Sequence, residues 1–283
     1  MSKSSHRQAQ HASRSVSARS PRWFGRAQSF VMGLMATMTM LAGCGVEQSP
    51  RGELADNKQL LASCDLSAPP ASLVLLDGTG SSASNAIIAD RMAAVESVAR
   101  RTAVCSGHLR VLVFSASSAA TTALFEGPLR MHGATENARL KRVPDAVADV
   151  MEQVRAGYDA AVKALPQGGS DITAQYRLAS EWIGQLDDPY RLHLYVLTDG
   201  FQTIGVDLGA RALSPQDAAA LADQVAVPKL SGASVVVAGL GRVAAGTPSS
   251  SVVEGLVAYY DALCRKAAAA ECVSVTDYAT EGR

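Results

Sequence analysis

The sequence lacks several features on which zinc and serine-hydrolase sites depend. It has no Cys-x-x-Cys pair, and its five histidines are scattered along the 283 residues, so the clustered ligands of a zinc ion are missing. It also has no Gly-x-Ser-x-Gly segment, which carries the nucleophile in many serine hydrolases. The first 44 residues contain no acidic side chain. The missing motifs disfavour zinc binding and serine-hydrolase chemistry. The lack of acidic residues distinguishes the N-terminal segment from the rest of the chain.

The N-terminal segment has the layout of a secretory signal. Six basic residues precede a 13-residue apolar stretch, residues 30–42, which is shorter than the roughly 20 residues of a membrane-spanning helix. Its end, Leu41-Ala42-Gly43-Cys44, resembles the lipobox of bacterial lipoproteins, whose cysteine is lipidated and becomes the new N-terminus. We therefore expect residues 1–43 to be a signal peptide and Cys44 to carry lipid. The alternative is a short anchor helix with an incidental cysteine.

Removal of this segment changes the charge of the chain. Six of the 26 basic residues lie in it and none of the 26 acidic ones does, so the remainder has 20 basic and 26 acidic residues, a formal charge of about −6. An acidic domain argues against a nucleic-acid partner, which needs clustered Lys and Arg to neutralise phosphates. We expect a protein of the bacterial cell envelope, lipid-anchored to a membrane and either periplasmic or on the outer surface.

The exported part divides into a linker and one domain. Residues 44–70 are polar and include three prolines, with one short helical possibility at 54–62, and we expect them to form a flexible tether. Residues 71–283 are long enough for a single domain with a substantial core. Cys64, Cys105, Cys264 and Cys272 are an even number in an oxidising compartment, and they allow three pairings. We favour Cys64 with Cys105 and Cys264 with Cys272; buried free thiols are the alternative.

Strand and helix patterns alternate along the domain. Apolar runs predict strands at residues 72–77, 108–115, 122–125, 192–198, 234–238 and 272–275. Helical patterns occur at residues 85–104, 135–165 with a break near Pro144, 170–186, 249–270, and after the capping Ser214-Pro215 pair. Such alternation predicts an α/β fold with a doubly wound, mostly parallel sheet and helices on both faces. The short connection before residues 122–125 allows one antiparallel edge strand.

Three segments rich in oxygen-bearing side chains follow strand ends or precede a helix. They are Asp77-Gly78-Thr79-Gly80-Ser81, Gly168-Gly169-Ser170-Asp171-Ile172-Thr173 and Thr198-Asp199-Gly200. Each alone would read as a turn or a helix cap. In a doubly wound sheet, however, all three reach the edge where ligands bind, and the glycines allow the first segment to curl. Together they supply the oxygen ligands that a hard cation such as Mg²⁺ requires.

These segments resemble the metal-ion-dependent adhesion site of von Willebrand factor A domains. Asp77, Thr79 and Ser81 match its D-x-S-x-S motif with Thr79 in place of a serine, and the Thr-Asp-Gly segment matches the motif that contains Asp199. Aligning on the glycines makes Ser170 the ligand of the middle motif; Thr173 is a less favoured substitute, and Asp171 is interpreted as a cap. The resemblance implies metal ligands at Asp77, Thr79, Ser81, Ser170 and Asp199. It also implies that Asp199 acts through water.

The resemblance implies a binding protein and no enzyme. The domain is expected to bind Mg²⁺, or Mn²⁺ or Ca²⁺, and to use the ion to bind an envelope or extracellular protein through an acidic residue of that partner. The alternatives are a metal-independent scaffold in envelope assembly and, with less support, a hydrolase. A haloacid-dehalogenase phosphatase is disfavoured because Leu75 occupies the position of its nucleophilic aspartate. The segment 239–244 imitates a dinucleotide fingerprint, but Gly246 and Pro248 prevent a helix from starting there.

Overall fold

The computed structural model describes residues 50–117, 121–166, 168–209 and 212–279. Residues 47–283 form one compact unit. The expected signal peptide at residues 1–43 and the expected lipidation site at Cys44 lie outside the described residues. Within the described part of the chain, no helix combines the length and apolar character that crossing a membrane requires.

The centre of the fold is a six-stranded sheet. Its strands are β1 (Pro70–Asp77), β2 (His108–Phe114), β3 (Thr121–Pro128), β4 (Arg191–Leu197), β5 (Ser234–Ala238) and β6 (Glu271–Val275). The spatial order is β3-β2-β1-β4-β5-β6, and all neighbours are parallel except β2 and β3, which are antiparallel. The expected α/β architecture with one antiparallel edge strand is therefore confirmed.

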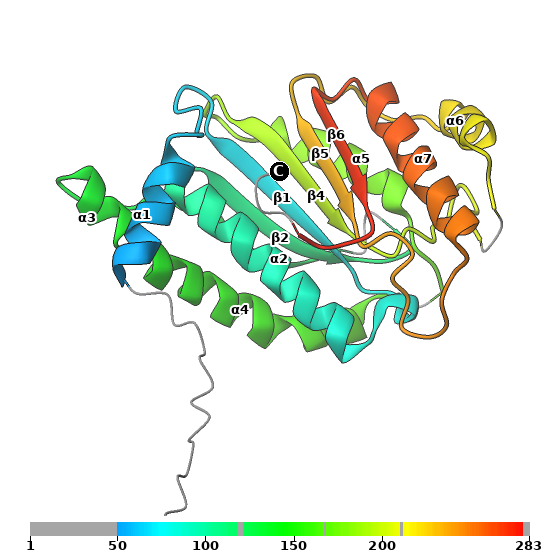
Figure 1. The fold of residues 1–283 in the computed structure, drawn as a ribbon, viewed down its shortest axis with the longest axis horizontal. Coiled ribbons are helices and arrows are strands. Elements are labelled where there is room, and N and C mark those ends of the chain that lie inside the picture. Colours follow the sequence, from blue (N-terminus) through cyan, green and yellow to red (C-terminus); the bar gives the residue numbers. More distant parts are fainter. Residues whose placement is uncertain (1–49, 118–120, 167, 210–211, 280–283) are drawn as a thin grey trace, which may run out of the picture. The chain divides into compact units, whose positions relative to one another are not determined.

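Helices cover both faces of the sheet (Figure 1). The described helices of more than one turn are α1 (Pro50–Leu61), α2 (Asn85–Val104), α3 (Glu136–Leu140), α4 (Val143–Ala164), α5 (Ile172–Ile183), α6 (Pro215–Asp223) and α7 (Ser250–Lys266). Helices α2 and α4 pack on one face, while α5 and α7 pack on the other, with α6 against α7. The helix expected over residues 135–165 is divided into α3 and α4, because Pro144 can only stand in the first turn of a helix.

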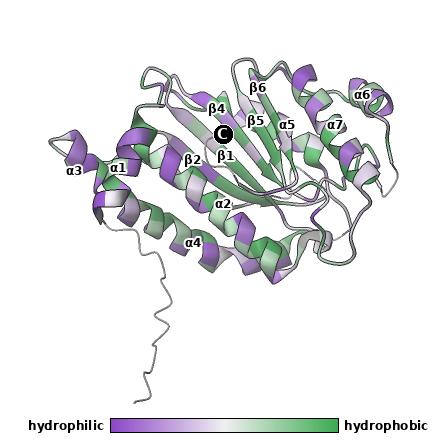
Figure 2. Ribbon diagram, in the orientation of Figure 1, coloured by the Kyte–Doolittle hydropathy of each residue, from purple (hydrophilic) through white to green (hydrophobic). Residues whose placement is uncertain are grey.

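The central strands are buried on both sides by these layers. Strand β1 is buried along its whole length, as expected from its continuous apolar run. Alternate residues of β1 enter the two cores: Val74 and Leu76 pack under α2, and Leu73 and Leu75 face the α5 side. Figure 2 shows hydrophobic colour along much of the central strands and alternating colours along the helices. The rigid sheet thus fixes the position of the chain where β1 and β4 end.

Residues 50–61, which lie in the segment 44–70 that is expected to form a flexible tether, form helix α1 and belong to the compact unit. Helix α1 packs on the core through Leu54, Leu60 and Leu61. Asn57 is buried; its amide donates to the carbonyl of Leu140 and its oxygen accepts from Arg100. The sequence pattern missed this because the contacts of Asn57 lie 43 and 83 residues away along the chain.

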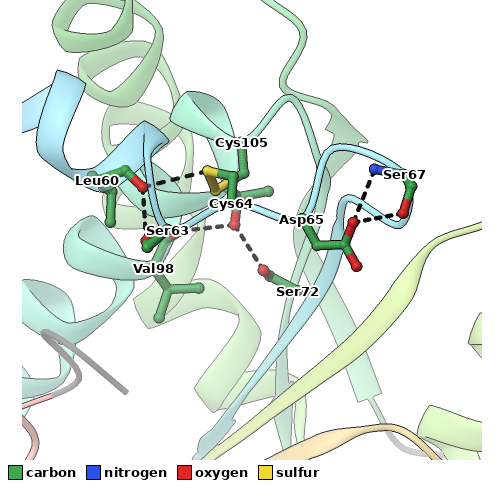
Figure 3. The surroundings of a disulfide bond; sticks show 9 residues. Leu60, Ser63, Cys64, Asp65, Ser67, Ser72, Val98 and Cys105 are labelled. Carbon is green, nitrogen blue, oxygen red and sulfur yellow. Dashed lines mark hydrogen bonds between the residues drawn. A yellow bond between two sulfur atoms is a disulfide. The ribbon is translucent and has the colours of Figure 1, made fainter.

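Both expected disulfides are present. Cys64, just after α1, is bonded to Cys105 at the end of α2, and Figure 3 shows this bridge beside Leu60 and Val98. Cys264 in α7 is bonded to Cys272 in β6. The Cys64–Cys105 bond closes 41 residues of chain and the Cys264–Cys272 bond closes eight. The first bond attaches the N-terminal helix to the body of the domain, and the second attaches α7 to the edge strand.

Candidate functional site

The candidate site lies at the carboxyl ends of β1 and β4, the two strands at the middle of the sheet. From β1 the chain proceeds to β2 on one side, and from β4 it proceeds to β5 on the other. In doubly wound sheets this reversal of strand order leaves a crevice in which ligands bind. Asp77 is the last residue of β1, and Asp199 lies two residues beyond β4. Both predicted carboxylates therefore come to the same switch point.

The Asp77 carboxylate is the centre of a network of hydroxyl groups. It is 1% exposed. Its Oδ1 accepts from the backbone N–H and hydroxyl of Thr79 at 3.0 and 2.7 Å. Its Oδ2 lies 3.4 Å from the Ser170 hydroxyl, and the Thr79 and Ser81 hydroxyl oxygens are 3.2 Å apart. Four of the five residues predicted from the sequence are thus brought into one continuous network of oxygen atoms.

The first segment curls as the predicted coordination requires. Gly78 N–H donates to the carbonyl of Phe114, and a side chain at Gly78 would lie 2.5 Å from Leu165. Residues Gly80–Ser82 then form a single turn of 3₁₀ helix. This turn brings Thr79 and Ser81 to the same side, although an extended chain would separate residues 77 and 81 by about 13 Å. Gly78 is therefore required for close packing, whereas a side chain at Gly80 would meet nothing within 4 Å.

Ser170 is positioned by the loop that follows β4. Its backbone N–H donates to the Thr203 hydroxyl, and its carbonyl accepts from the N–H groups of Thr203 and Ile204. Ser170 is 3% exposed, so its hydroxyl points into the protein toward Asp77. Asp171, the next residue, accepts from the N–H of Ala174 and caps α5, as expected. Thr173 donates to Gln202 Oε1, whereas the Ser170 hydroxyl donates to Asp77 Oδ2, so Ser170 is the better ligand candidate.

Thr198 and Asp199 join the two strand ends. The Thr198 hydroxyl donates to Asp77 Oδ2 at 2.6 Å and accepts from the N–H of Gly200. Asp199 is fully buried; its Oδ1 accepts from the N–H of Phe201, and its carbonyl accepts from Gly241. Thr198 lies in the Thr-Asp-Gly segment but is not among the predicted ligands. Its signal was a hydroxyl placed directly after a buried strand.

Residues 239–244, which imitate a dinucleotide fingerprint, form a loop, as the sequence interpretation expects. Helix α7 starts only at Ser250, well after this segment. Gly241 donates to the Asp199 carbonyl, and the N–H of Ala244 donates to the carbonyl of Ser81 at 2.7 Å. The β5–α7 loop therefore supports two of the three oxygen-rich segments.

A hollow of about 300 Å³ opens over these groups. Thr79, Ser81 and Ser170 line it together with Phe201 and Thr203, and glycines 78, 80, 168 and 169 form much of its wall. Small residues leave the backbone and the hydroxyl oxygens accessible from this side. The hollow is therefore an entrance to the Asp77 network.

The donor set fits a hard divalent cation and does not fit a soft one. Among the described residues no three His, Cys, Asp or Glu side chains form a cluster, so a zinc-like or all-carboxylate site is not found there. What is present is one carboxylate with three neighbouring hydroxyls and a second buried carboxylate on the adjacent loop. Such ligands suit Mg²⁺ or Mn²⁺, which accept hydroxyl and carboxylate oxygens and keep water molecules.

Among the solved structures that the chain resembles are two of low sequence identity. One is the conserved hypothetical protein BatB from Bacteroides thetaiotaomicron, with 13% identity and a TM-score of 0.38 over 73% of this chain and 89% of that one. The other is the pilus adhesin SpaC from Lactobacillus rhamnosus GG in an open conformation, with 13% identity and a TM-score of 0.37 over 74% of this chain and 28% of the adhesin. No protein-family model and no curated protein matches the chain.

The topology of the sheet defines the class of protein. The strand order, the single antiparallel edge strand and the two helical layers define a doubly wound α/β domain with an oxygen-lined site at its switch point.

Proposed function

We propose that this chain is a von Willebrand factor A-type domain of an exported bacterial lipoprotein, and that it binds a divalent cation in order to bind a protein partner. Asp77, Thr79, Ser81 and Ser170 would hold the ion, with Asp199 acting through water. The ion would be Mg²⁺, or Mn²⁺ or Ca²⁺. The partner is an envelope or extracellular protein that presents an exposed carboxylate. Cys44 would attach the domain to the membrane through lipid.

The observation that carries the proposal is the assembly of hydroxyl oxygens around one buried carboxylate. Three hydroxyls, those of Thr79, Thr198 and Ser170, lie within 2.6 to 3.4 Å of the Asp77 carboxylate oxygens, and they come from three separate parts of the chain. A turn or a helix cap would account for Thr79 alone. It would not account for the convergence of residues 93 and 121 positions away.

The charge of the ligands explains why an acidic partner is favoured. Three of the five ligand candidates are uncharged hydroxyls, and Asp199 would act through water. Asp77 would then be the one negatively charged candidate in direct contact with the ion, so the inner coordination shell would neutralise the charge of the ion only in part. A carboxylate from a partner would complete the coordination and reduce the remaining charge. One carboxylate on a hydrated ion is a weak contact, so the surface around the hollow must contribute the specificity.

The proposal is tested by capture of a partner with and without the cation. Residues 47–283 are immobilised and exposed to envelope extract in Mg²⁺ or in chelator, beside Asp77→Ala and Asp207→Asn. Asp207 is an exposed carboxylate in the loop after β4, so its variant is a control for lost surface charge. A partner retained only in Mg²⁺ and only by the wild type and Asp207→Asn supports the proposal. Capture that is unchanged by chelator and by Asp77→Ala contradicts it.

A metal-independent scaffold is the second candidate. In that case Asp77 would serve only to hold the loops through Thr79 and Thr198, a role that its hydrogen bonds also allow. Retention of the same partner in chelator would support the scaffold. Turnover of an ester or phosphate panel that is lost in Asp77→Ala would instead support a hydrolase.

A further inference from the structure

Arg91 is a charged side chain buried directly beneath the candidate site. It lies on α2 and is 0% exposed. Its Nη1 donates to the backbone carbonyl of Asp77 at 2.6 Å, and its Nε donates to the Tyr278 hydroxyl at 3.2 Å. The guanidinium carbon also lies 5.5 Å from the centre of the Tyr278 ring. Arg91 thus holds the end of β1 by a hydrogen bond to Asp77, the residue that carries the central carboxylate.

No carboxylate pairs directly with this buried cation in the described part of the chain. None of the ion pairs there includes Arg91, and its Nη2 has no hydrogen-bond partner there. A buried arginine without a counter-charge is strongly unfavourable. Some other negative charge must therefore balance it.

The Asp77 carboxylate belongs to the residue whose backbone carbonyl accepts from Arg91. Burial raises the pKa of Tyr158, and Arg91 and Asp77 then act on it in opposite directions. Burial also raises the pKa of Tyr278, with Arg91 and Asp199 again acting in opposite directions. The same two tyrosines therefore lie in the field of Arg91 and of a site carboxylate. Asp77 and Asp199 are themselves buried.

We propose that Arg91 is the permanent counter-charge of the metal site and the residue that positions Asp77. This inference rests on the proposed function. Arg91 holds the end of β1 by its hydrogen bond to the Asp77 carbonyl, and its charge offsets one of the two carboxylate charges when no ion is bound. Because it also repels a cation, Arg91 lowers the affinity of the site for divalent ions.

Arg91 also changes the net charge that a partner would meet at the site. Two site carboxylates against Arg91 and a divalent ion leave one net positive charge. A single carboxylate from a partner would neutralise it. Without Arg91 the metal-loaded site would already be neutral, and it would attract an acidic group less strongly. Arg91 thus weakens the binding of the metal ion and strengthens the attraction of an acidic partner.

The test compares Arg91→Met, which removes the charge at similar volume, with Arg91→Lys, which keeps it. Thermal unfolding of residues 47–283 is measured in chelator and in saturating Mn²⁺. Arg91→Met should unfold at a lower temperature in chelator, and Mn²⁺ should raise its midpoint by about 3 °C or more beyond the increase seen in the wild type. Arg91→Lys should show an increase close to that of the wild type. If Arg91 were merely structural, Mn²⁺ would raise the midpoints of both variants by no more than it raises that of the wild type. That result would overturn the proposed effect of Arg91 on metal affinity.

A second measurement tests the counter-charge without any metal. Asp77→Asn is combined with Arg91→Met, and all four proteins are unfolded in chelator. If Arg91 balances Asp77, Asp77→Asn should lower the midpoint of the wild type but raise that of Arg91→Met; additive effects would overturn the counter-charge. If Arg91→Met alone does not fold, recovery of folding in the double variant supports the proposal and its absence contradicts it. A wild type that shows no response to Mn²⁺ overturns the proposed metal function, while this cycle still decides the role of Arg91.

Discussion

The Thr198 hydroxyl donates a hydrogen bond of 2.6 Å to Asp77 Oδ2, although 121 residues separate the two in the chain. Both groups are fully or almost fully buried, so water cannot replace the bond. Thr198 also accepts from the N–H of Gly200 and so fixes the loop that carries Asp199. This single hydroxyl connects the two halves of the candidate site.

Removal of the Thr198 hydroxyl should therefore loosen both halves. Thr198→Val leaves Asp77 Oδ2 with only the longer contact to Ser170 and leaves the buried N–H of Gly200 without its Thr198 acceptor, and we expect a loss of about 1–3 kcal/mol in the free energy of unfolding. Divalent ions should also bind more weakly. Urea unfolding and calorimetry measure the two effects. Thr198→Ser keeps the hydroxyl and should retain most of both, whereas an equal loss in the serine variant would place the effect in the methyl group.

The two disulfides should contribute unequally to stability. In the chain-entropy description, a bond that closes 41 residues stabilises by roughly 4 kcal/mol and one that closes eight by roughly 2.5 kcal/mol. Replacing Cys64 and Cys105 by serine should thus cost more than replacing Cys264 and Cys272. Denaturant unfolding of the two double variants measures the difference.

Hydrogen exchange adds a local test of the first disulfide. Loss of the Cys64–Cys105 bond should increase exchange in α1, which the bond attaches to the end of α2. Unchanged exchange in α1 would mean that Asn57 and the leucines of α1 hold the helix without the disulfide.

Gly239 should be intolerant of any side chain. It has a φ of +93°, and an added Cβ would lie 2.2 Å from the Tyr278 ring, which Arg91 and Arg242 flank. Backbone strain and overpacking together predict a loss of roughly 3 kcal/mol for Gly239→Ala. Gly232 has a φ of +78° and open space around it, so Gly232→Ala should show the strain alone, about 1–2 kcal/mol. Equal losses at the two positions would mean that the Tyr278 ring moves aside easily.

His193 should make the domain less stable in mild acid. Burial lowers the pKa of His193 to about 4, with Arg101 and Arg191 acting in the same direction. The unfolded chain therefore binds a proton below about pH 6.5 that the folded protein accepts only near pH 4. The free energy of unfolding should fall as the pH decreases through this window and should be insensitive to His193 above it.

Urea unfolding at pH 7 and pH 5 tests this effect in the wild type and in His193→Gln. The loss between the two pH values should be smaller in the variant. Part of the loss should remain, because burial also lowers the pKa of His108. An identical loss in both proteins would show that His193 is not the group responsible.

Much of the fold could be predicted because its core elements have strong local patterns. The unbroken apolar run of β1 indicated a strand buried on both faces, and the helical pattern at residues 85–104 matched α2 at both ends. The order of the strands could not be predicted, since it depends on pairings such as Val74 with Tyr195 across the sheet. The docking of α1 was missed for the same reason, because its partners are distant in the chain.

The sequence predicted the residues of the candidate site but not the residues that hold them in position. Asp77, Thr79 and Ser81 have a recognisable spacing, and Ser170 and Asp199 lie in segments of similar composition. In the sequence, nothing distinguishes Arg91 from a polar residue on the exposed side of a helix. Its burial follows from the packing of α2 on β1, which the sequence pattern does not predict. Tyr278 likewise comes after the last strand and had no pattern to mark it. Long-range contacts of single residues leave no periodic signal.

The central claim is that the oxygens around Asp77 bind a divalent cation, and calorimetric titration of residues 47–283 with Mg²⁺ and Mn²⁺ tests it most directly. The wild type should bind one ion, Asp77→Ala should not bind it, and Asp207→Asn should bind like the wild type. Absence of binding by the wild type, or equal binding by Asp77→Ala, would contradict the claim.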